Sequence, residues 1–152
     1  MRDVITADQI DAARRWPCAI DVLRAGVVAG ESVTTPQRHH HSMGTADDSQ
    51  TLLLMPSWSD QYAGVKLVTV FPTNRDTDVA TINGNYLLLD GTIGVPLAIL
   101  DGGALTARRT AAASILAATM LARPDSRRLV VVGSGRLAAE LARGYCTLFP
   151  ID

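Results

Sequence analysis

A glycine-rich segment near the end of the chain is the first candidate for ligand binding. Residues Gly133–Ala138 fit the pattern G-x-G-x-x-A of a dinucleotide-binding turn. In such a turn the first glycine permits the tight bend and the second lets the backbone approach a pyrophosphate. Free N–H groups at the start of the next helix then face the anion. The competing interpretation is an ordinary turn between a strand and a helix.

Two adjacent arginines, Arg108 and Arg109, lie near the start of a long alanine-rich stretch with high helix propensity. With Thr106 as the expected N-cap, both cations oppose the helix dipole, which is unfavourable unless they bind an anion. An arginine fork together with helix N–H donors would hold a substrate carboxylate. Two solvated surface arginines are the alternative, and position alone leaves the choice open.

Lys66 is expected inside a valine-rich strand, on the same face as Val68 and Val70. A lysine among valines is unusual unless its ammonium reaches a cleft, where loss of water would lower its pKa and favour proton donation. The alternative is an edge-strand lysine that discourages aggregation. Arg38 precedes the histidines His39–His41, whose side chains alternate in an extended segment and therefore predict no metal site.

The elements that must position these residues form an α+β pattern. The expected helices begin near Ala7, span residues 17–30 and 104–121, and follow the glycine turn to about Leu148. The segment over 32–49 is polar and is expected to be irregular. The expected strands are Thr51–Met55 (closed by Pro56), Val65–Phe71, Tyr86–Leu89, Val95–Leu100 and the apolar Arg128–Val132.

Composition narrows the classes of protein. Of the 152 residues, 47% are hydrophobic and 19% are charged, which is typical of a globular domain. The 14 basic and 15 acidic residues leave no excess charge to attract nucleic acid or an anionic membrane. No apolar run is long enough to cross a bilayer, and the N-terminus lacks the apolar segment of a signal peptide. We expect a cytoplasmic protein with no nucleic-acid or membrane partner.

The glycine turn raises a question of completeness. A dinucleotide-binding sheet needs a second parallel strand and an acidic residue about 20 positions beyond the glycines. Neither occurs before Asp152. One strand and one helix cannot form a doubly wound sheet, so we expect a truncated chain, a partial gene product or a fragment that a partner completes.

Several sequence blocks occur in one order along the chain, from about Gly30 to Pro150. They are Leu53–Pro56, Gly64–Asn74, Asn83–Asp90, Thr92–Ala98 and Leu105–Ser114, followed by the glycine turn. Together these blocks resemble the ornithine cyclodeaminase/mu-crystallin family, and their number makes the resemblance more specific than any single motif. The chain departs from the family at Asp78-Val79-Ala80, where Gly-Leu-Pro is common, and at Leu137, where glutamine is common.

The resemblance implies a fold and an activity. Residues 1–124 would form an α+β domain with a mostly antiparallel sheet, which binds substrate and makes a homodimer. Residues 125–152 would be the first βα unit of a truncated Rossmann domain that binds NAD or NADP. The sequences of the arginine segment (residues 106–114) and of the histidine segment (residues 36–41) most resemble those of the bacterial Δ1-pyrroline-2-carboxylate reductases. The complete protein would therefore reduce a cyclic imino acid (Δ1-pyrroline-2-carboxylate or Δ1-piperideine-2-carboxylate), and the isolated chain is expected to be inactive.

The same resemblance implies roles for single residues. Arg38 and Arg109 would bind the substrate carboxylate, and Lys66 would contact the substrate and transfer a proton. Residues that would contact the cofactor are Thr81 and Arg109 near the nicotinamide, and Gly133, Gly135, Arg136 and Leu137 in the pyrophosphate turn. An NAD-recycling ornithine cyclodeaminase and a non-catalytic mu-crystallin-like binding protein are the alternatives.

Overall fold

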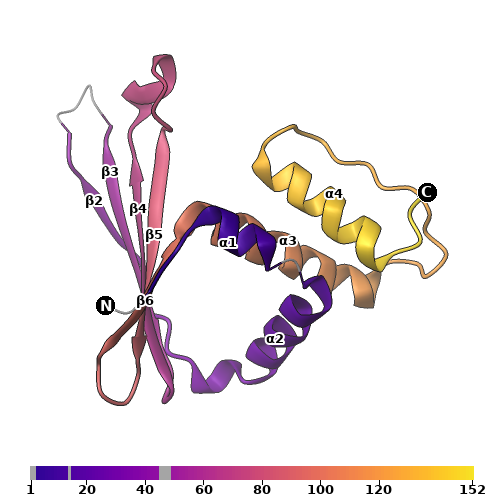
Figure 1. Ribbon diagram of the computed structural model, residues 1–152, viewed down its shortest axis with the longest axis horizontal. Coiled ribbons are helices and arrows are strands. Elements are labelled where there is room, and N and C mark those ends of the chain that lie inside the picture. Colours follow the sequence, from indigo (N-terminus) through magenta and orange to yellow (C-terminus); the bar gives the residue numbers. More distant parts are fainter. Residues whose placement is uncertain (1–2, 14, 45–48) are drawn as a thin grey trace. The chain divides into compact units, whose positions relative to one another are not determined.

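The chain divides into two compact units (Figure 1). A computed structural model describes residues 3–13, 15–44 and 49–152. The first unit comprises residues 1–10 and 31–103, and the second comprises residues 11–30 and 104–152. The expected domain boundary near residue 124 remains a prediction.

In the part of the first unit that the structure describes, six strands form a single sheet in the order β1-β6-β5-β4-β3-β2. The strands are β1 (Asp3–Ile5), β2 (His39–Ser42), β3 (Thr51–Trp58), β4 (Tyr62–Val70), β5 (Ile82–Asp90) and β6 (Pro96–Asp101). Strand β1 runs parallel to β6, and the four remaining neighbouring pairs are antiparallel. The prediction of an α+β fold with a mostly antiparallel sheet is confirmed.

Two parts of the sheet differ from the expectation. Residues His39–Ser42 form an edge strand on β3, although this polar segment was expected to be irregular. Strand β3 also continues through Pro56 to Trp58. Strand β2 pairs only with residues 51–54 of β3, so Pro56 lies beyond that pairing, where a residue without an N–H is tolerated.

The expected hairpin between β5 and β6 is present, and one carboxylate organises its turn. Asp90 Oδ1 accepts hydrogen bonds from the Thr92 hydroxyl, from the Thr92 N–H (2.8 Å) and from the Ile93 N–H (3.2 Å). These bonds favour the ionised form, with the Thr92 hydroxyl contributing most, and they lower the pKa of Asp90. The turn is therefore fastened by a charged acceptor.

Among the described residues, four helices accompany the strands: α1 (Ala7–Ala12), α2 (Trp16–Val28), α3 (Gly102–Leu121) and α4 (Arg136–Leu148). The capping box predicted for α1 is confirmed, because the Thr6 N–H donates to Gln9 Oε1 (2.9 Å) and the Gln9 N–H donates to Thr6 Oγ1 (3.4 Å). Short 3₁₀ turns occupy Gly30–Ser32 and Pro72–Asp76. None of the described helices combines the length and the apolar character needed to cross a membrane.

Helix α3 begins earlier than the sequence predicts. It follows β6 directly at Gly102, so Thr106 lies inside the helix and is not its N-cap. The reason is the close approach of Gly102 to the backbone of Gly84 in β5, where a Cβ atom would lie 2.7 Å from the carbonyl carbon. Only glycine permits the helix to start this close to the sheet.

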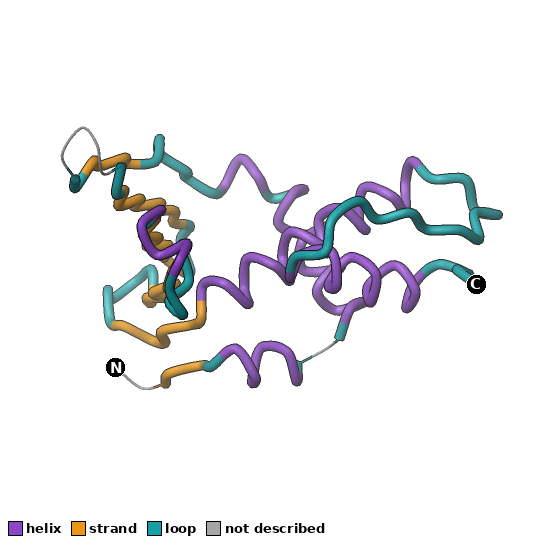
Figure 2. The backbone as a smooth tube through the Cα atoms, turned by 90° about the horizontal axis from the view of Figure 1, so that it is seen from above, coloured by secondary structure: helices purple, strands orange, loops and turns teal. Residues whose placement is uncertain are grey.

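The second unit has its own apolar core, formed by helices α2, α3 and α4 (Figure 2, purple). The buried members are Trp16, Ile20, Ala111, Ala112, Ile115 and Leu116. Gly144 brings α4 close to this core, because a Cβ there would overlap the Ile115 side chain and lie 3.2 Å from the Trp16 ring. The alanine-rich sequence of α3 therefore serves close helix packing as well as helix propensity.

The strand expected at Arg128–Val132 is not formed. Residues 126–134 have no strand or helix hydrogen bonding, and Val130 and Val132 are 85% and 96% exposed. A strand forms only when its N–H and C=O groups bond to a neighbouring strand, and no described strand pairs with this segment. The helix expected after the glycine turn is present as α4.

Candidate functional site

Lys66 lies in the interior of the sheet, which excludes the interpretation as an edge-strand lysine. Its partner on β3 is Met55 and its partner on β5 is Tyr86. Residues directly opposite one another on antiparallel strands point to the same face, so the three side chains form a row across the sheet. Lys66 is half-buried. Val68 follows on this face, as the sequence predicts.

Arg38 lies next to the same row. It directly precedes β2, one position before the pair His39–Leu54. Met55 follows Leu54 in β3, so Arg38 is in register with Met55 on the β2 side of that strand. Lys66 pairs with Met55 on the other side, in β4. The structure thus brings two of the predicted substrate residues to one region of the sheet, with Arg38 exposed.

The histidines beside Arg38 alternate between the two faces of β2, as expected. The rings of His39 and His41 have centroids 6.2 Å apart on one face. Among the described residues, no group of three or more His, Cys, Asp or Glu side chains could hold a metal ion.

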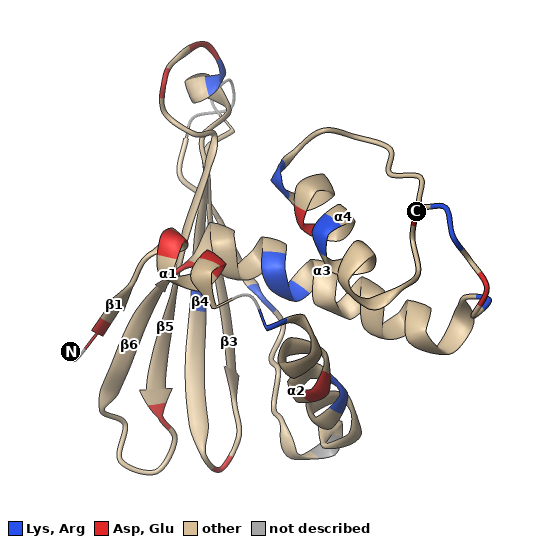
Figure 3. Cartoon of the chain, turned by 45° about the vertical axis from the view of Figure 1, so that its right-hand side comes forward, with Lys and Arg blue, Asp and Glu red and all other residues tan. Residues whose placement is uncertain are grey.

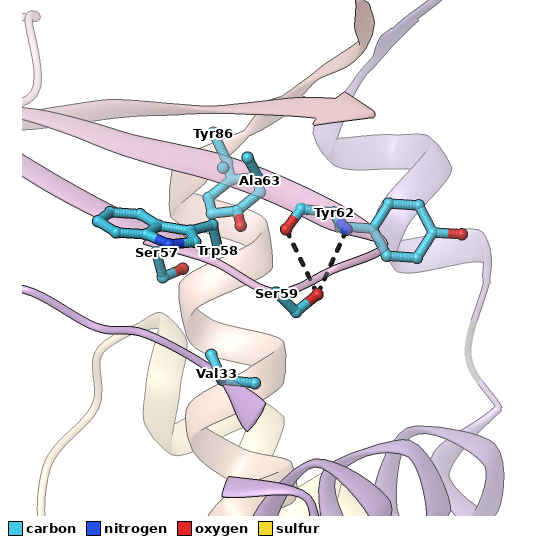
Figure 4. A pocket seen from close by; sticks show the side chains of 8 residues that line it. Val33, Ser57, Trp58, Ser59, Tyr62, Ala63 and Tyr86 are labelled. Carbon is cyan, nitrogen blue, oxygen red and sulfur yellow. Dashed lines mark hydrogen bonds between the residues drawn. The ribbon is translucent and has the colours of Figure 1, made fainter. Parts of the chain in front are cut away.

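A pocket of about 180 Å³ opens at the end of the β3–β4 hairpin, beside the Lys66 row (Figure 4). Ser57 and Gly64 form a pair across β3 and β4 and belong to the same face as Lys66. The phenol ring of Tyr86 lies over Gly64, because a Cβ atom at position 64 would overlap the tyrosine hydroxyl. Glycine at this position makes room for the tyrosine.

Aromatic and aliphatic side chains complete the pocket. Val33 and Trp58 contribute apolar surface, while the ring of Tyr62 extends away from the pocket (Figure 4). The tip of the hairpin is fixed by Ser59, whose N–H donates to the Tyr62 carbonyl oxygen (2.8 Å) and whose Oγ accepts from the Tyr62 N–H (3.3 Å). Apolar walls with a few hydroxyl groups suit a small ring with a polar end.

The two adjacent arginines of α3 have different environments in the second unit. Arg109 is exposed. Arg108 is only 9% exposed, with its guanidinium carbon 4.4 Å from the centre of the Trp16 ring and its Nε 3.5 Å from Glu140 Oε2. The interpretation as two solvated surface arginines is therefore wrong for Arg108. Figure 3 shows the basic stretch of α3 in blue and the start of α4 with both acidic (red) and basic (blue) residues.

The glycine turn has the backbone that a phosphate site requires. Gly133 has a φ of +117°, a conformation that favours glycine. Gly135 is the N-cap of α4, and no side chain caps the N–H groups of the first turn. A Cβ atom at Gly133 or Gly135 would meet nothing within 4 Å, so the space in front of the turn is open. Arg136 and Leu137 begin α4 and are both exposed.

A turn that binds a dinucleotide pyrophosphate needs such features, and binding of the cofactor by Gly133, Gly135, Arg136 and Leu137 remains a prediction. Thr81 belongs to the other unit, where its carbonyl oxygen accepts a hydrogen bond from the Phe71 N–H (2.8 Å) just before β5. The proximity of Arg109 to Lys66, and the role of Thr81 near a nicotinamide, remain predictions.

Sequence reasoning does not single out Tyr86 or Glu140. Tyr86 alternates with Leu88 like any strand residue, and its position opposite Lys66 depends on strand register. Glu140 carried a clearer signal, since it is the only acidic residue of α4 and lies four positions after Arg136 and three before Arg143.

The fold and these features define an α+β chain with a mostly antiparallel sheet and a glycine turn at the start of its last helix. Over residues 2–152 the sequence matches the model of the ornithine cyclodeaminase/mu-crystallin family. The chain belongs to this family.

Three relatives illustrate the similarity. A Δ1-pyrroline-2-carboxylate reductase of Bacillus cereus is 40% identical over 126 residues, which are 82% of this chain and 38% of that protein. The structure of Thermococcus litoralis Δ1-pyrroline-2-carboxylate reductase with NADH and L-proline has 27% identity and a TM-score of 0.83, and the match covers 98% of this chain and 47% of that one. An archaeal alanine dehydrogenase dimer with bound NAD has 25% identity and a TM-score of 0.82, covering 97% and 46%. The chain thus spans less than half the length of these relatives.

Proposed function

We propose that the complete protein reduces a cyclic imino acid, Δ1-pyrroline-2-carboxylate or its six-membered homologue, with NADH or NADPH. The observation that carries the proposal is the row of Lys66, Met55 and Tyr86, with Arg38 beside it, on one face of the sheet. The 40% identity to a Δ1-pyrroline-2-carboxylate reductase supports the same substrate class.

Each proposed role follows from the chemistry of the side chain. The guanidinium groups of Arg38 and Arg109 bind the substrate carboxylate, since planar forks match its two oxygens. The Lys66 ammonium donates a proton to the imine nitrogen, which makes the adjacent carbon electrophilic. The pocket beside Tyr86 accepts the apolar part of the ring.

The glycine turn would hold the pyrophosphate of the dinucleotide through the N–H groups of Gly135, Arg136 and Leu137. A bound nicotinamide would supply the hydride that adds to the imine carbon. Arg38 and Arg109 orient the ring of the substrate, and Lys66 provides the proton, so that the C=N bond becomes an amine.

The test is an assay of the protein in the full length that its gene encodes, with Δ1-pyrroline-2-carboxylate, Δ1-piperideine-2-carboxylate and either nucleotide. We expect oxidation of NADH or NADPH to depend on the imino acid, and Lys66→Ala to lower kcat by about 10²–10⁴-fold. Unchanged turnover in Lys66→Ala would remove that residue from the mechanism. Release of ammonia from ornithine without net NADH would identify a cyclodeaminase instead, and ligand binding without hydride transfer a binding protein.

We also propose that the protein forms a homodimer through the first unit. The partial exposure of β3 and β5 supports this, since most of their residues are neither buried nor fully exposed. The archaeal alanine dehydrogenase is itself a dimer. Light scattering after size-exclusion chromatography should give twice the mass of one chain, and a monomer at micromolar concentration would contradict the proposal.

A further inference from the structure

Glu140 of α4 is a buried carboxylate to which the proposed reaction assigns no role. The residue is 3% exposed. A carboxylate removed from water is stable only with cations or donors around it. Arg143 Nη1 donates to Oε1 at 2.7 Å, and Arg108 Nε lies 3.5 Å from Oε2. Neither Arg108 Nε nor Glu140 Oε2 has a hydrogen-bond partner among the described residues, so each of these atoms depends on the other for electrostatic compensation.

Arg108 connects this carboxylate to the other helices of the second unit. Its guanidinium stacks on the Trp16 ring at the start of α2, at 4.4 Å from the ring centre. Its Nη2 donates to the main-chain oxygen of Asp11 (3.4 Å). Three different groups thus fix one guanidinium in orientation, which a lysine ammonium could not reproduce.

A second contact links Asp11 to the start of α4. The Asp11 carboxylate accepts a hydrogen bond from Arg136 Nη2 at 3.3 Å. Arg136 and Glu140 are four residues apart and therefore lie on the same face of α4. The first two turns of α4 are held at two points, through Arg136 on Asp11 and through Glu140 on Arg108.

We propose that Glu140 and Arg108 are positioning residues, whose internal ion pair sets the orientation of the first turn of α4 and of the glycine turn before it. Helix N–H groups bind an anion only if they are aimed at it, so this orientation controls nucleotide affinity. The link to affinity rests on the proposed function; the link to the order of the turn does not. Arg108 acts from inside the unit, while its neighbour Arg109 is exposed.

The test uses a double variant that replaces the pair by apolar residues of similar size, Arg108→Met with Glu140→Leu. Arg108→Met leaves Glu140 Oε2 uncompensated, although Arg143 still bonds Oε1, and Glu140→Leu leaves the buried Arg108 without a carboxylate. Both single substitutions should lower the thermal unfolding temperature, whereas the double variant should recover most of that loss. The matched control is Arg123→Met, because the Arg123–Asp125 pair has side chains that are 84% and 80% exposed. This control should leave the thermal unfolding temperature, the exchange rates of the α4 amides and the nucleotide Kd unchanged.

Two measurements on the double variant distinguish positioning from a purely structural role. Hydrogen exchange of the amides at residues 138–141, the first in α4 that donate to main-chain oxygens, should be faster by about tenfold or more, and the Kd for NADH or NADPH should rise by a similar factor. A double variant that is stable and keeps the exchange rates of the original protein would overturn the proposal. If the original protein binds neither nucleotide, the proposed function fails, and the exchange rates still decide whether the ion pair orders the turn.

Discussion

Lys66 and Tyr86 stand directly opposite each other on β4 and β5, and the phenol of Tyr86 extends over Gly64, two residues from the lysine. An ammonium group and an aromatic wall are therefore neighbours on one face of the sheet. The absence of a side chain at position 64 is what permits this arrangement. Gly64 and Tyr86 thus act as one unit, and substitutions at the two positions should not be additive.

Gly64→Ala should test this coupling. The added methyl group overlaps the tyrosine hydroxyl, so the ring must move and the free energy of unfolding should fall by about 1–3 kcal/mol. In a Tyr86→Ala background the same substitution should cost close to nothing. Urea unfolding of the two single variants and the double variant measures the coupling. An equal loss in both backgrounds would show that Gly64 is needed for another reason.

Lys66 is the only lysine of the chain, which allows a direct test of its contact with a carboxylate ligand. Among residues 1–152 an amine-selective acylating reagent has two targets, Lys66 and the N-terminal amine. L-Proline, which the Thermococcus relative binds, should slow acylation of Lys66 and leave the N-terminal amine unaffected. Prolinamide, which lacks the carboxylate, is the control. Equal acylation rates of the peptide that contains Lys66, with and without proline, measured by mass spectrometry after digestion of the full-length protein, would argue against a ligand at Lys66.

Gly144→Ala should destabilise the second unit. The methyl group would enter the space of Ile115, which is fully buried, and approach the Trp16 ring. The same substitution at Gly26 in α2 meets no atom within 4 Å and should stabilise the helix by about 0.5–1 kcal/mol. Both variants gain helix propensity, so the difference between them isolates the overlap, which we expect to be about 1–3 kcal/mol in urea unfolding. Similar stabilities would mean that α4 can shift without cost.

Asp90 predicts a pH dependence of stability. Hydrogen bonds from Thr92 and Ile93 lower its pKa in the folded chain, so the unfolded chain binds the proton more tightly. The stabilisation is therefore complete above the ordinary carboxyl pKa and is lost as the pH falls through the lowered value. Asp90→Ala should reduce the thermal unfolding temperature at pH 7 and matter progressively less in acid. An effect of equal size at every pH would exclude this charge as the cause.

Much of the fold could be predicted because local signals agree with it. The Thr6–Gln9 capping box, the β5–β6 turn and the alanine-rich helix each correspond to one local pattern. The edge strand His39–Ser42 could not be predicted, because its polar side chains show no apolar alternation and its stability comes from pairing with β3. For Arg128–Val132 the prediction was wrong in the opposite sense. Its apolar composition predicts a strand, but none of the described strands pairs with it.

The candidate site was predictable to the extent that single residues are unusual in their surroundings. Lys66 among valines and the glycines at 133 and 135 are such cases. Tyr86 and Glu140 depend on which residues lie opposite them in another strand or helix, and a sequence pattern carries no register between distant segments.

The segment Leu129–Val132, in which Val130 and Val132 are exposed, bears on how the chain behaves at high concentration. Four successive apolar residues of high β-propensity, with neither proline nor charge among them, can pair edge to edge with the same segment of another molecule. Arg127 and Arg128 directly precede this segment, and repulsion between these positive charges on two molecules opposes such pairing. Added salt screens that repulsion, so the solubility of this chain should fall as ionic strength rises.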